Sequence, residues 1–511
     1  MRRSSVSLAV WLGLATVPAL AEAPLSAIDW LKQPAPVSVA QPLVTPLAEP
    51  PVAHGATVPE VAVMSLGDTS ADAVGLLPSG TTGLPRGLWA ASATDTLVAQ
   101  IARIDETPLP AVQALYYTLL LAEADPPEDA ADNARFLRAR IAALRRFGAV
   151  EPALALIERA GPATPALFDE WLELALLTGR ADAPCAALAR APLLTADHAA
   201  RVYCLARAGD WATAALTYEA AVALDTLSAQ EADLLEGYLD PELAGGLADL
   251  PPPPEMTPLL FRLYEAGGMP LPTRTLPRAY AVADLRGTMG WKTAIEAAER
   301  LARAGALPAN QLLGLYTERR PAASGGVWDR VRAVQRLDAA LAQGDAAGIA
   351  RHLPPAWQMM RENGLGVVFA TLYGPDLIGR DLGPEAARLA YEVALLSPEY
   401  ESARPPGAQT RRLRFLAGLA GGAPDPALAR GPTEEAIATA FAATRAPDDH
   451  AGPLAQGRLG QTLLTVAGHL QGAGPRDNRR LTASLATLRM AGLEGVARQA
   501  ALQILLLQSP R

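Results

Sequence analysis

Two cysteines are the residues with the best-defined chemistry in this sequence. Cys185 and Cys204 lie 19 positions apart, and the 511-residue chain contains no other cysteine. In an oxidising compartment an isolated pair usually forms a disulfide, and two buried free thiols are the alternative. Two sulfurs without clustered histidines or acids cannot complete the tetrahedral shell of a zinc site. We therefore expect a structural disulfide and no metal.

The remaining reactive side chains form no catalytic pattern. The sequence contains no His-Glu-x-x-His, no Gly-x-Ser-x-Gly elbow and no Gly-x-x-x-x-Gly-Lys phosphate loop. Its five histidines are scattered along the chain: His54, His198, His352, His450 and His469. We therefore predict no catalytic residue and no cofactor.

One acidic pair shares its first two residues with a motif of a known class of envelope enzyme. Lytic transglycosylase domains carry a Glu-Ser step and a downstream Gly-Leu-Met-Gln. The only Glu-Ser pair is Glu401-Ser402, and Ala-Arg-Pro-Pro follows it instead of a helix and cleft pattern. A glycan-acting hydrolase with an unrecognised site stays as an alternative function.

The first 21 residues have the pattern of a cleavable export signal. Arg2 and Arg3 precede an apolar run from Val6 to Val17, and Ala19-Leu20-Ala21 supplies the small residues that signal peptidase accepts. The apolar run is shorter than the roughly 20 residues of a spanning helix, so a retained anchor is the less favoured alternative. We predict cleavage after Ala21, release into the periplasm and no stable membrane insertion afterwards.

A short amphipathic segment follows the predicted cleavage site. Residues 22–33 are expected to form an exposed helix, and residues 34–90 are rich in proline, which favours a flexible linker. A short helix on a long tether can present a docking peptide to a partner. Alternatively, it folds back and caps its own chain. The apolar residues of this candidate docking helix are Leu25, Ile28, Trp30 and Leu31.

Composition predicts an all-α fold for the rest of the chain. Hydrophobic residues make up 50% and aromatic residues only 5%, and alanine and leucine, which favour helices, dominate the apolar content. From residue 91 onward apolar residues recur at steps of three and four. A proline-rich break at 251–277 is expected to separate an N-terminal helical block, 91–250, from a C-terminal block, 278–511. The formal net charge of -9 does not suit nucleic acid or an anionic membrane surface.

Three consecutive segments share a pattern that begins with glycine. Gly148, Gly179 and Gly209 are 31 and 30 residues apart, and each precedes apolar and small residues at matching positions. Glycine permits the positive φ that ends a helix tightly, and the small residues let paired helices approach closely. The clearest copy has Trp211, Ala214, Tyr218 and Ala221 after its glycine.

This spacing resembles the tetratricopeptide repeat. Residues 209–221 are similar to the second-helix half of that motif, whereas His198, Arg201 and Val202 depart from its first-helix half, and the period is shorter than the family's 34 residues. The resemblance implies an α-solenoid of stacked helical hairpins. Irregular hairpins that meet by common packing rules are the alternative. The same alignment places Cys185 and Cys204 on adjacent helices of neighbouring hairpins.

These features indicate a binding protein rather than an enzyme. We expect a periplasmic scaffold or adaptor that binds another envelope protein through a groove of the helical repeats. A glycan-acting envelope hydrolase and an accessory factor of the periplasmic flagellar motor are the alternatives.

Overall fold

The structure is a computed structural model that describes residues 70–131, 133–240, 242, 250–407, 410–471 and 477–507. All of them belong to one compact unit, Leu66–Arg511. The predicted signal peptide, 1–21, the candidate docking helix, 22–33, and most of the predicted linker lie outside the described residues.

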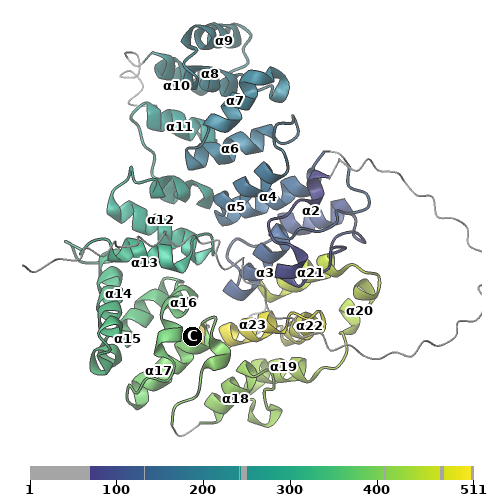
Figure 1. Ribbon diagram of the computed structural model, residues 1–511, viewed down its shortest axis with the longest axis vertical. Coiled ribbons are helices and arrows are strands. Elements are labelled where there is room, and N and C mark those ends of the chain that lie inside the picture. The colour runs from purple at the N-terminus through teal and green to yellow at the C-terminus, as the bar shows by residue number, and fades with distance from the viewer. Residues whose placement is uncertain are drawn as a thin grey trace, which may run out of the picture. The chain divides into compact units, whose positions relative to one another are not determined.

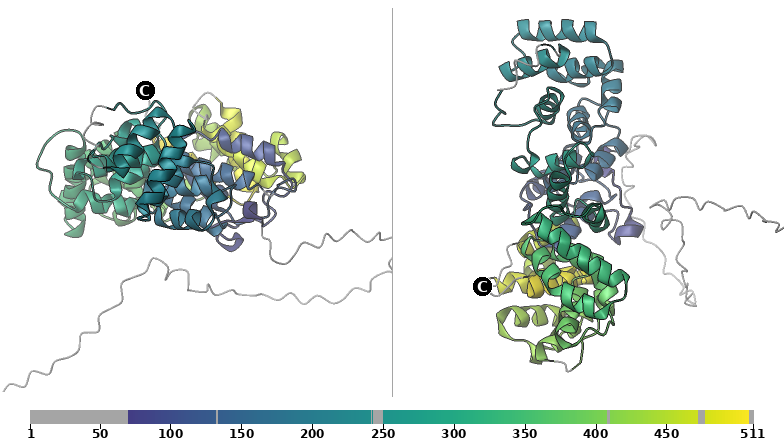
Figure 2. Two further views of the ribbon diagram at one scale, coloured as in Figure 1. Left: turned by 90° about the horizontal axis from the view of Figure 1, so that it is seen from above. Right: turned by 90° about the vertical axis from the view of Figure 1, so that its left-hand side faces the viewer.

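The fold is all-α, as the composition predicts, and 67% of it is helical (Figures 1 and 2). The described ranges contain no β-strand, although an isolated parallel bridge joins Leu77 to Ala122. None of the described helices combines the length and the apolar character that crossing a membrane requires.

The described helices follow one another along the chain, some through tight turns and others through longer connections. The first part of the chain forms α1 (Ser79–Thr82), α2 (Thr94–Ala102), α3 (Pro110–Leu121), α4 (Arg135–Phe147), α5 (Val150–Arg159), α6 (Phe168–Thr178), α7 (Asp182–Arg190), α8 (His198–Arg207), α9 (Trp211–Ala223), α10 (Ala229–Leu239) and α11 (Pro258–Ala266). The second part forms α12 (Trp291–Arg303), α13 (Ala309–Thr317), α14 (Val327–Ala342), α15 (Ala346–Glu362), α16 (Gly366–Leu377), α17 (Pro384–Leu395), α18 (Arg411–Ala420), α19 (Gly431–Ala442), α20 (Asp448–Ala455), α21 (Leu459–Gln471), α22 (Asn478–Met490) and α23 (Glu494–Leu507). Short 3-10 segments connect them: η2 (Ala71–Ala73), η3 (Pro192–Leu194), η5 (Thr273–Thr275), η6 (Arg278–Leu285), η7 (Tyr400–Ser402) and η8 (Pro426–Leu428).

The glycine pattern marks the tight turns of consecutive helical hairpins. Gly148, Gly179 and Gly209 have φ values of 81°, 79° and 83°, which favour glycine. They separate α4 from α5, α6 from α7 and α8 from α9, and each of these helices packs against the next. In α9 the small residues Ala214 and Ala221 are fully buried, so they are the positions at which its neighbours approach most closely.

A disulfide connects neighbouring hairpins. Cys185 on α7 and Cys204 on α8 are bonded, and their Cα atoms lie 4.9 Å apart. Both residues are buried where α7 packs against α8. The bond therefore fastens the second helix of one hairpin to the first helix of the next, as the repeat alignment predicts.

The predicted linker is wrong in its last part, because residues 70–90 are packed against the helices. Leu88 and Trp89 are almost completely buried. The buried guanidinium of Arg140 donates hydrogen bonds to the carbonyls of Val74 and Ala122, at 2.7 and 3.0 Å. The proline content suggested extended chain here, but bulky apolar residues before residue 90 bury enough surface to hold the segment in place.

The apolar core does not follow the order of the chain. A smaller cluster of buried residues lies within 281–396, and a larger one combines residues of 84–283 with residues of 391–504. Helix α11 falls inside the segment 251–277 that is predicted to separate two blocks, and it packs against α6 and α10. The two-block division remains a prediction.

The larger cluster exists because the first helices pack against the last ones, a contact that we call the closing interface. Helix α3 contacts α21 and α23, and α2 contacts α21 (Figure 1). The backbone N–H of Ala111 donates to Gln503 Oε1 at 2.8 Å, and Gln471 Nε2 donates to the Tyr116 hydroxyl at 2.6 Å. The backbone N–H of Gly460 donates to the Leu88 carbonyl at 3.1 Å. These bonds join residues more than 350 positions apart in the sequence.

The disulfide yields a first prediction. Replacing both cysteines, Cys185→Ala with Cys204→Ala, should lower the free energy of unfolding by about 2–4 kcal/mol, because the bond restricts the unfolded chain. Denaturant titration monitored by circular dichroism measures the difference, and with reductant present the variant and the parent protein should coincide. If a thiol reagent labels both cysteines of the folded, unreduced protein, the bond does not exist.

The closing interface yields a second prediction. A Cβ atom at position 460 would lie 2.4 Å from the Trp89 ring. Gly460→Ala should therefore cost about 1–3 kcal/mol of folding stability, since the indole has to move within a packed core. Gly468→Ala is the matched control on the same helix, because its Cβ meets no atom within 4 Å. The control should stabilise α21 by up to about 1 kcal/mol, and equal effects of the two changes would contradict the proposed packing.

Candidate functional site

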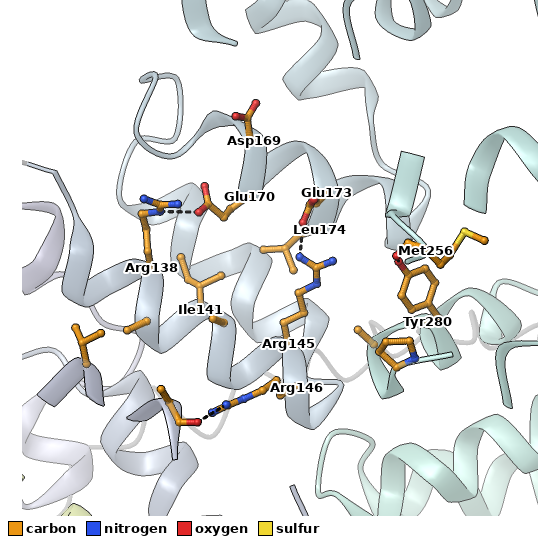
Figure 3. Close-up of a pocket in the computed structure, with 16 residues that line it drawn as sticks. Arg138, Ile141, Arg145, Arg146, Asp169, Glu170, Glu173, Leu174, Met256 and Tyr280 are labelled. Atoms are coloured by element: carbon orange, nitrogen blue, oxygen red, sulfur yellow. Dashed lines mark hydrogen bonds and ion pairs between the residues drawn. The ribbon is translucent and has the colours of Figure 1, made fainter. Parts of the chain in front are cut away.

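A groove of about 700 Å³ opens between α4, α6 and η6 (Figure 3). Its lining is mainly apolar and comes from segments that are distant in the sequence. The apolar residues that line it include Val98, Ala102, Ile141, Ala142, Leu174 and Ala279. A hollow of this size and character is typical of a binding site.

The residue spacing of α4 explains how it forms one wall. Arg138, Ile141, Ala142 and Arg145 recur at steps of three and four, so they share a face of the helix. Other positions of α4, among them Phe136, are buried in the core. The helix is therefore fixed by its buried face and presents a mixed apolar and basic face to the groove.

Two ion pairs join α4 to α6 at the groove, and Asp169 also lies on the lining. Arg138 Nε lies 2.6 Å from Glu170 Oε1, and Arg145 forms an ion pair with Glu173 (Figure 3). Arg146 donates to the carbonyls of Ile101 and Ala102, at 2.7 and 2.6 Å, where the last carbonyls of α2 need partners. Because these charges are compensated within the protein, the groove does not attract a ligand by strong net charge.

Tyr280 closes the groove on the side of η6. Its hydroxyl donates to the backbone carbonyl of Met256, and burial raises its pKa to about 12. The phenol is therefore neutral at physiological pH. It contributes a flat apolar surface rather than a base or a nucleophile.

The groove offers an apolar floor, and Glu170 and Glu173 on its rim are engaged by arginines. Acid–base catalysis needs a group that is free to exchange a proton with a substrate. No pair of a nucleophile and a base lines this groove among the residues that the structure describes.

A second hollow, of about 520 Å³, brings two histidines together. His450 on α20 and His469 on α21 have ring centroids 5.9 Å apart, and their planes are inclined by 28°. Asp449, Asp477 and Arg480 also line this hollow. The sequence pattern did not pair these histidines, because their 19-residue separation matches no metal or catalytic motif.

Hydrogen bonding defines the tautomer of His450. The Thr487 hydroxyl donates to the Ala483 carbonyl at 2.8 Å, so it can only accept from the imidazole. His450 Nδ1, 2.7 Å from that hydroxyl, must therefore carry the proton, and Nε2 keeps its lone pair. Within the described ranges, no cluster of three or more His, Cys, Asp or Glu side chains is arranged to hold a metal ion.

A buried ionic cluster elsewhere is structural. Glu299 accepts hydrogen bonds from Arg330 at 2.7 and 2.6 Å and from the Tyr316 hydroxyl at 2.7 Å. Burial, the largest cause, raises the pKa of Tyr316 well above its usual value. Both carboxylate oxygens are already occupied, so the cluster holds α12, α13 and α14 together and offers no free group for chemistry.

The residues predicted from the repeat pattern do not line the groove. Gly148 and Gly179 lie at turns, and Trp211 and Tyr218 lie on α9. The sequence nevertheless contains a pattern that relates to the groove, which is the spacing of its charged residues. Several ion pairs join residues about one repeat apart: Arg138 with Glu170, Arg145 with Glu173, and Glu151 with Arg180, at separations of 32, 28 and 29 residues.

No family model, curated protein or solved structure matches this chain.

The histidine pair predicts a dependence of stability on pH. Burial, with the neighbouring His469 charge adding to it, lowers the pKa of His450 below its ordinary 6.5, and burial followed by Arg480 lowers that of His469. Below pH 6.5 the unfolded chain binds protons that the folded chain resists, so stability falls as the pH drops through 6.5 toward the folded-state pKa values. Unfolding free energies measured between neutral and mildly acidic pH should show this loss.

His450→Gln should reduce the loss of stability, because it removes one of the depressed groups. His352→Gln on α15 provides the matched control, since it removes an imidazole outside the pair. Equal pH profiles for the two variants would contradict a specific role of the pair.

Proposed function

We propose that this chain is an exported, non-catalytic adaptor that binds a segment of another envelope protein in the groove between α4, α6 and η6. The observation that carries the proposal is the combination of an apolar floor with a rim of internally paired charges. An apolar floor supplies affinity by burial, and the paired rim supplies hydrogen-bonding groups that orient the ligand.

The geometry favours a peptide segment as the ligand. A groove of about 700 Å³ is open on one side and accommodates several side chains of a helix or an extended strand. Its compensated charges disfavour nucleic acid, which requires clustered unpaired cations. The best ligand is therefore a weakly charged amphipathic segment.

The likeness to tetratricopeptide repeats supports this proposal without carrying it. The turns at Gly148, Gly179 and Gly209 separate successive hairpins, and ion pairs about one repeat apart connect them. Stacked hairpins of this kind form extended binding surfaces. The closing interface distinguishes this fold from a simple solenoid, in which each repeat contacts only its neighbours.

The proposal of export rests on the predicted signal peptide, 1–21, together with the disulfide between Cys185 and Cys204. A disulfide buried between two helices persists most readily in an oxidising compartment such as the periplasm.

The enzyme alternative has one observation in its favour, which is the pair of His450 and His469 in a hollow with acidic residues. His450 Nε2 keeps a lone pair that a general base requires. If this site were catalytic, His450→Gln would abolish the biological activity of the chain, whereas changes at the groove would leave that activity intact.

The groove yields a further prediction. Ala142 is an exposed residue of α4 that lines it, so Ala142→Arg should fill the groove without disturbing the core. A photo-crosslinking residue at position 142, expressed in the native organism, should trap an envelope protein. With that protein purified, Ala142→Arg should weaken binding by at least about tenfold, because a long cation blocks the apolar floor. Isothermal titration calorimetry measures the affinity.

Ala347 provides the control for both steps. It is an exposed alanine near the start of α15, so Ala347→Arg introduces the same charge on a helix that does not line the groove. Crosslinks of equal yield at 142 and 347, or equal affinities of the two arginine variants, would contradict the groove as the binding site.

A further inference from the structure

Residues 444–457 connect α19 to α21 and are attached to the rest of the protein at one main point. We call this stretch, which includes α20, the α20 segment (Figure 1). His450 is its only buried residue, and all its other residues are exposed or half-buried. Among the described residues, the one hydrogen bond that joins the segment to another helix runs from His450 Nδ1 to the Thr487 hydroxyl of α22, at 2.7 Å. A single histidine therefore anchors fourteen residues.

The α20 segment has little helical stability of its own. Helix α20 has only eight residues, and Gly452 and Pro453 lie inside it. Glycine disfavours a helix, and an internal proline removes one of its hydrogen bonds. An isolated helix shorter than about 12 residues is marginal in water even without such residues. The segment therefore keeps its conformation only while it is held against α21 and α22.

Its second link to α22 is weak. Asp449 of α20 forms an ion pair with Arg479 at 3.8 Å, and these side chains are 63% and 87% exposed. An exposed pair of this kind contributes little to stability, because water and salt screen it. By contrast, the neighbouring helices α19 and α21 each bury several apolar side chains. Loss of the His450 contact would thus free the α20 segment and leave its neighbours in place.

The surroundings of His450 disfavour a positive charge. The charged and titratable groups that line its hollow come from three elements: Asp449 on α20, His469 on α21, and Asp477, Arg479 and Arg480 at the start of α22. Both aspartates already have an arginine partner, at 3.8 and 3.0 Å. A protonated His450 would therefore be a buried cation that faces a second imidazole and receives little compensation from the acids.

We propose that the α20 segment is a pH-operated latch, which is closed while His450 and His469 are neutral and leaves α21 and α22 when they take up protons. In water an imidazolium is fully hydrated, so protonation favours the released position of His450 over the buried one. Because His450 is the main anchor, its departure carries the rest of the segment with it.

The direction of the pH effect follows from the two states of His450. In the closed state burial, followed by the His469 charge, lowers its pKa below the ordinary 6.5, which the released side chain regains. The released state thus binds protons more tightly, and release becomes more favourable as the pH falls below 6.5. Each histidine can change the release equilibrium by at most about tenfold per pH unit.

Release of the latch would uncover a surface of α22. The hollow of about 520 Å³ around the histidines and a neighbouring one of about 610 Å³ are both lined by Asp449, Arg479 and Ala483. Asp449 belongs to the latch, so its departure removes a wall that the two hollows share and joins them. No residue of these hollows lines the groove, so the latch does not rest on the proposed adaptor function.

Hydrogen–deuterium exchange of the purified protein, read by mass spectrometry, tests the latch. The amides of His450, Ala451 and Gln456 donate hydrogen bonds within the segment and are the reporters. Their protection, taken relative to the intrinsic exchange rate at each pH, should fall by about tenfold or more between about pH 7.5 and pH 5.5. The amides of α21 and α22 should keep their protection over the same range, because these helices stay folded.

Two variants separate the anchor from its charge. His450→Gln cannot take up a proton, so the segment should lose most of its pH dependence. His450→Ala removes the anchor, so protection of the segment should already be low at neutral pH. His352→Gln on α15 is the matched control and should behave like the parent protein.

Three results would overturn the proposal. The first is protection of the α20 segment that does not change with pH, or that changes equally in the parent protein and in His450→Gln. The second is parent-like protection of the segment in His450→Ala at neutral pH. The third is a loss of protection that α20, α21 and α22 share, since that would be global unfolding rather than release of a latch.

Discussion

The burial of α3 on nearly every side is the constraint on which the rest of this fold depends. Val112 and Leu119 of this helix are completely buried, and α4, α21 and α23 all pack against it. The Tyr117 hydroxyl also donates to the carbonyl of Ala304 at 2.8 Å, which ties α3 to the end of α12. A helix that is apolar all round is stable only inside such a core. Helix α3 therefore joins the early, middle and late parts of the chain.

This constraint also positions the candidate groove. Helix α4 packs on α3, and Arg146 of α4 holds the last carbonyls of α2. The wall formed by α6 is linked to α4 by the ion pairs of Glu170 and Glu173, and η6 packs against both helices. The groove is thus preformed, which reduces the conformational entropy lost when a ligand binds.

Two kinds of buried polar group serve different purposes in this protein. The carboxylate of Glu299 and the guanidinium of Arg140 have several partners each, so their burial fixes the arrangement of helices and leaves little to titrate or exchange. His450 and His469 are different, because burial lowers their pKa values and favours their neutral form in the folded chain. Buried polar groups with a full set of hydrogen-bond partners therefore stabilise the fold, whereas buried histidines with fewer partners respond to pH.

The sequence by itself determined the local features of this protein. Helical periodicity, the positive-φ turns at Gly148 and Gly179 and the bridge from Cys185 to Cys204 follow from interactions between residues on the same or adjacent helices. Only the tertiary structure decided that residues 70–90 pack against the helices, that α9 exposes large apolar side chains, and that the groove combines α2, α4, α6 and η6. It alone also revealed the closing interface. Contacts between segments hundreds of residues apart leave no periodic signal in one sequence, because many different side chains satisfy the same packing.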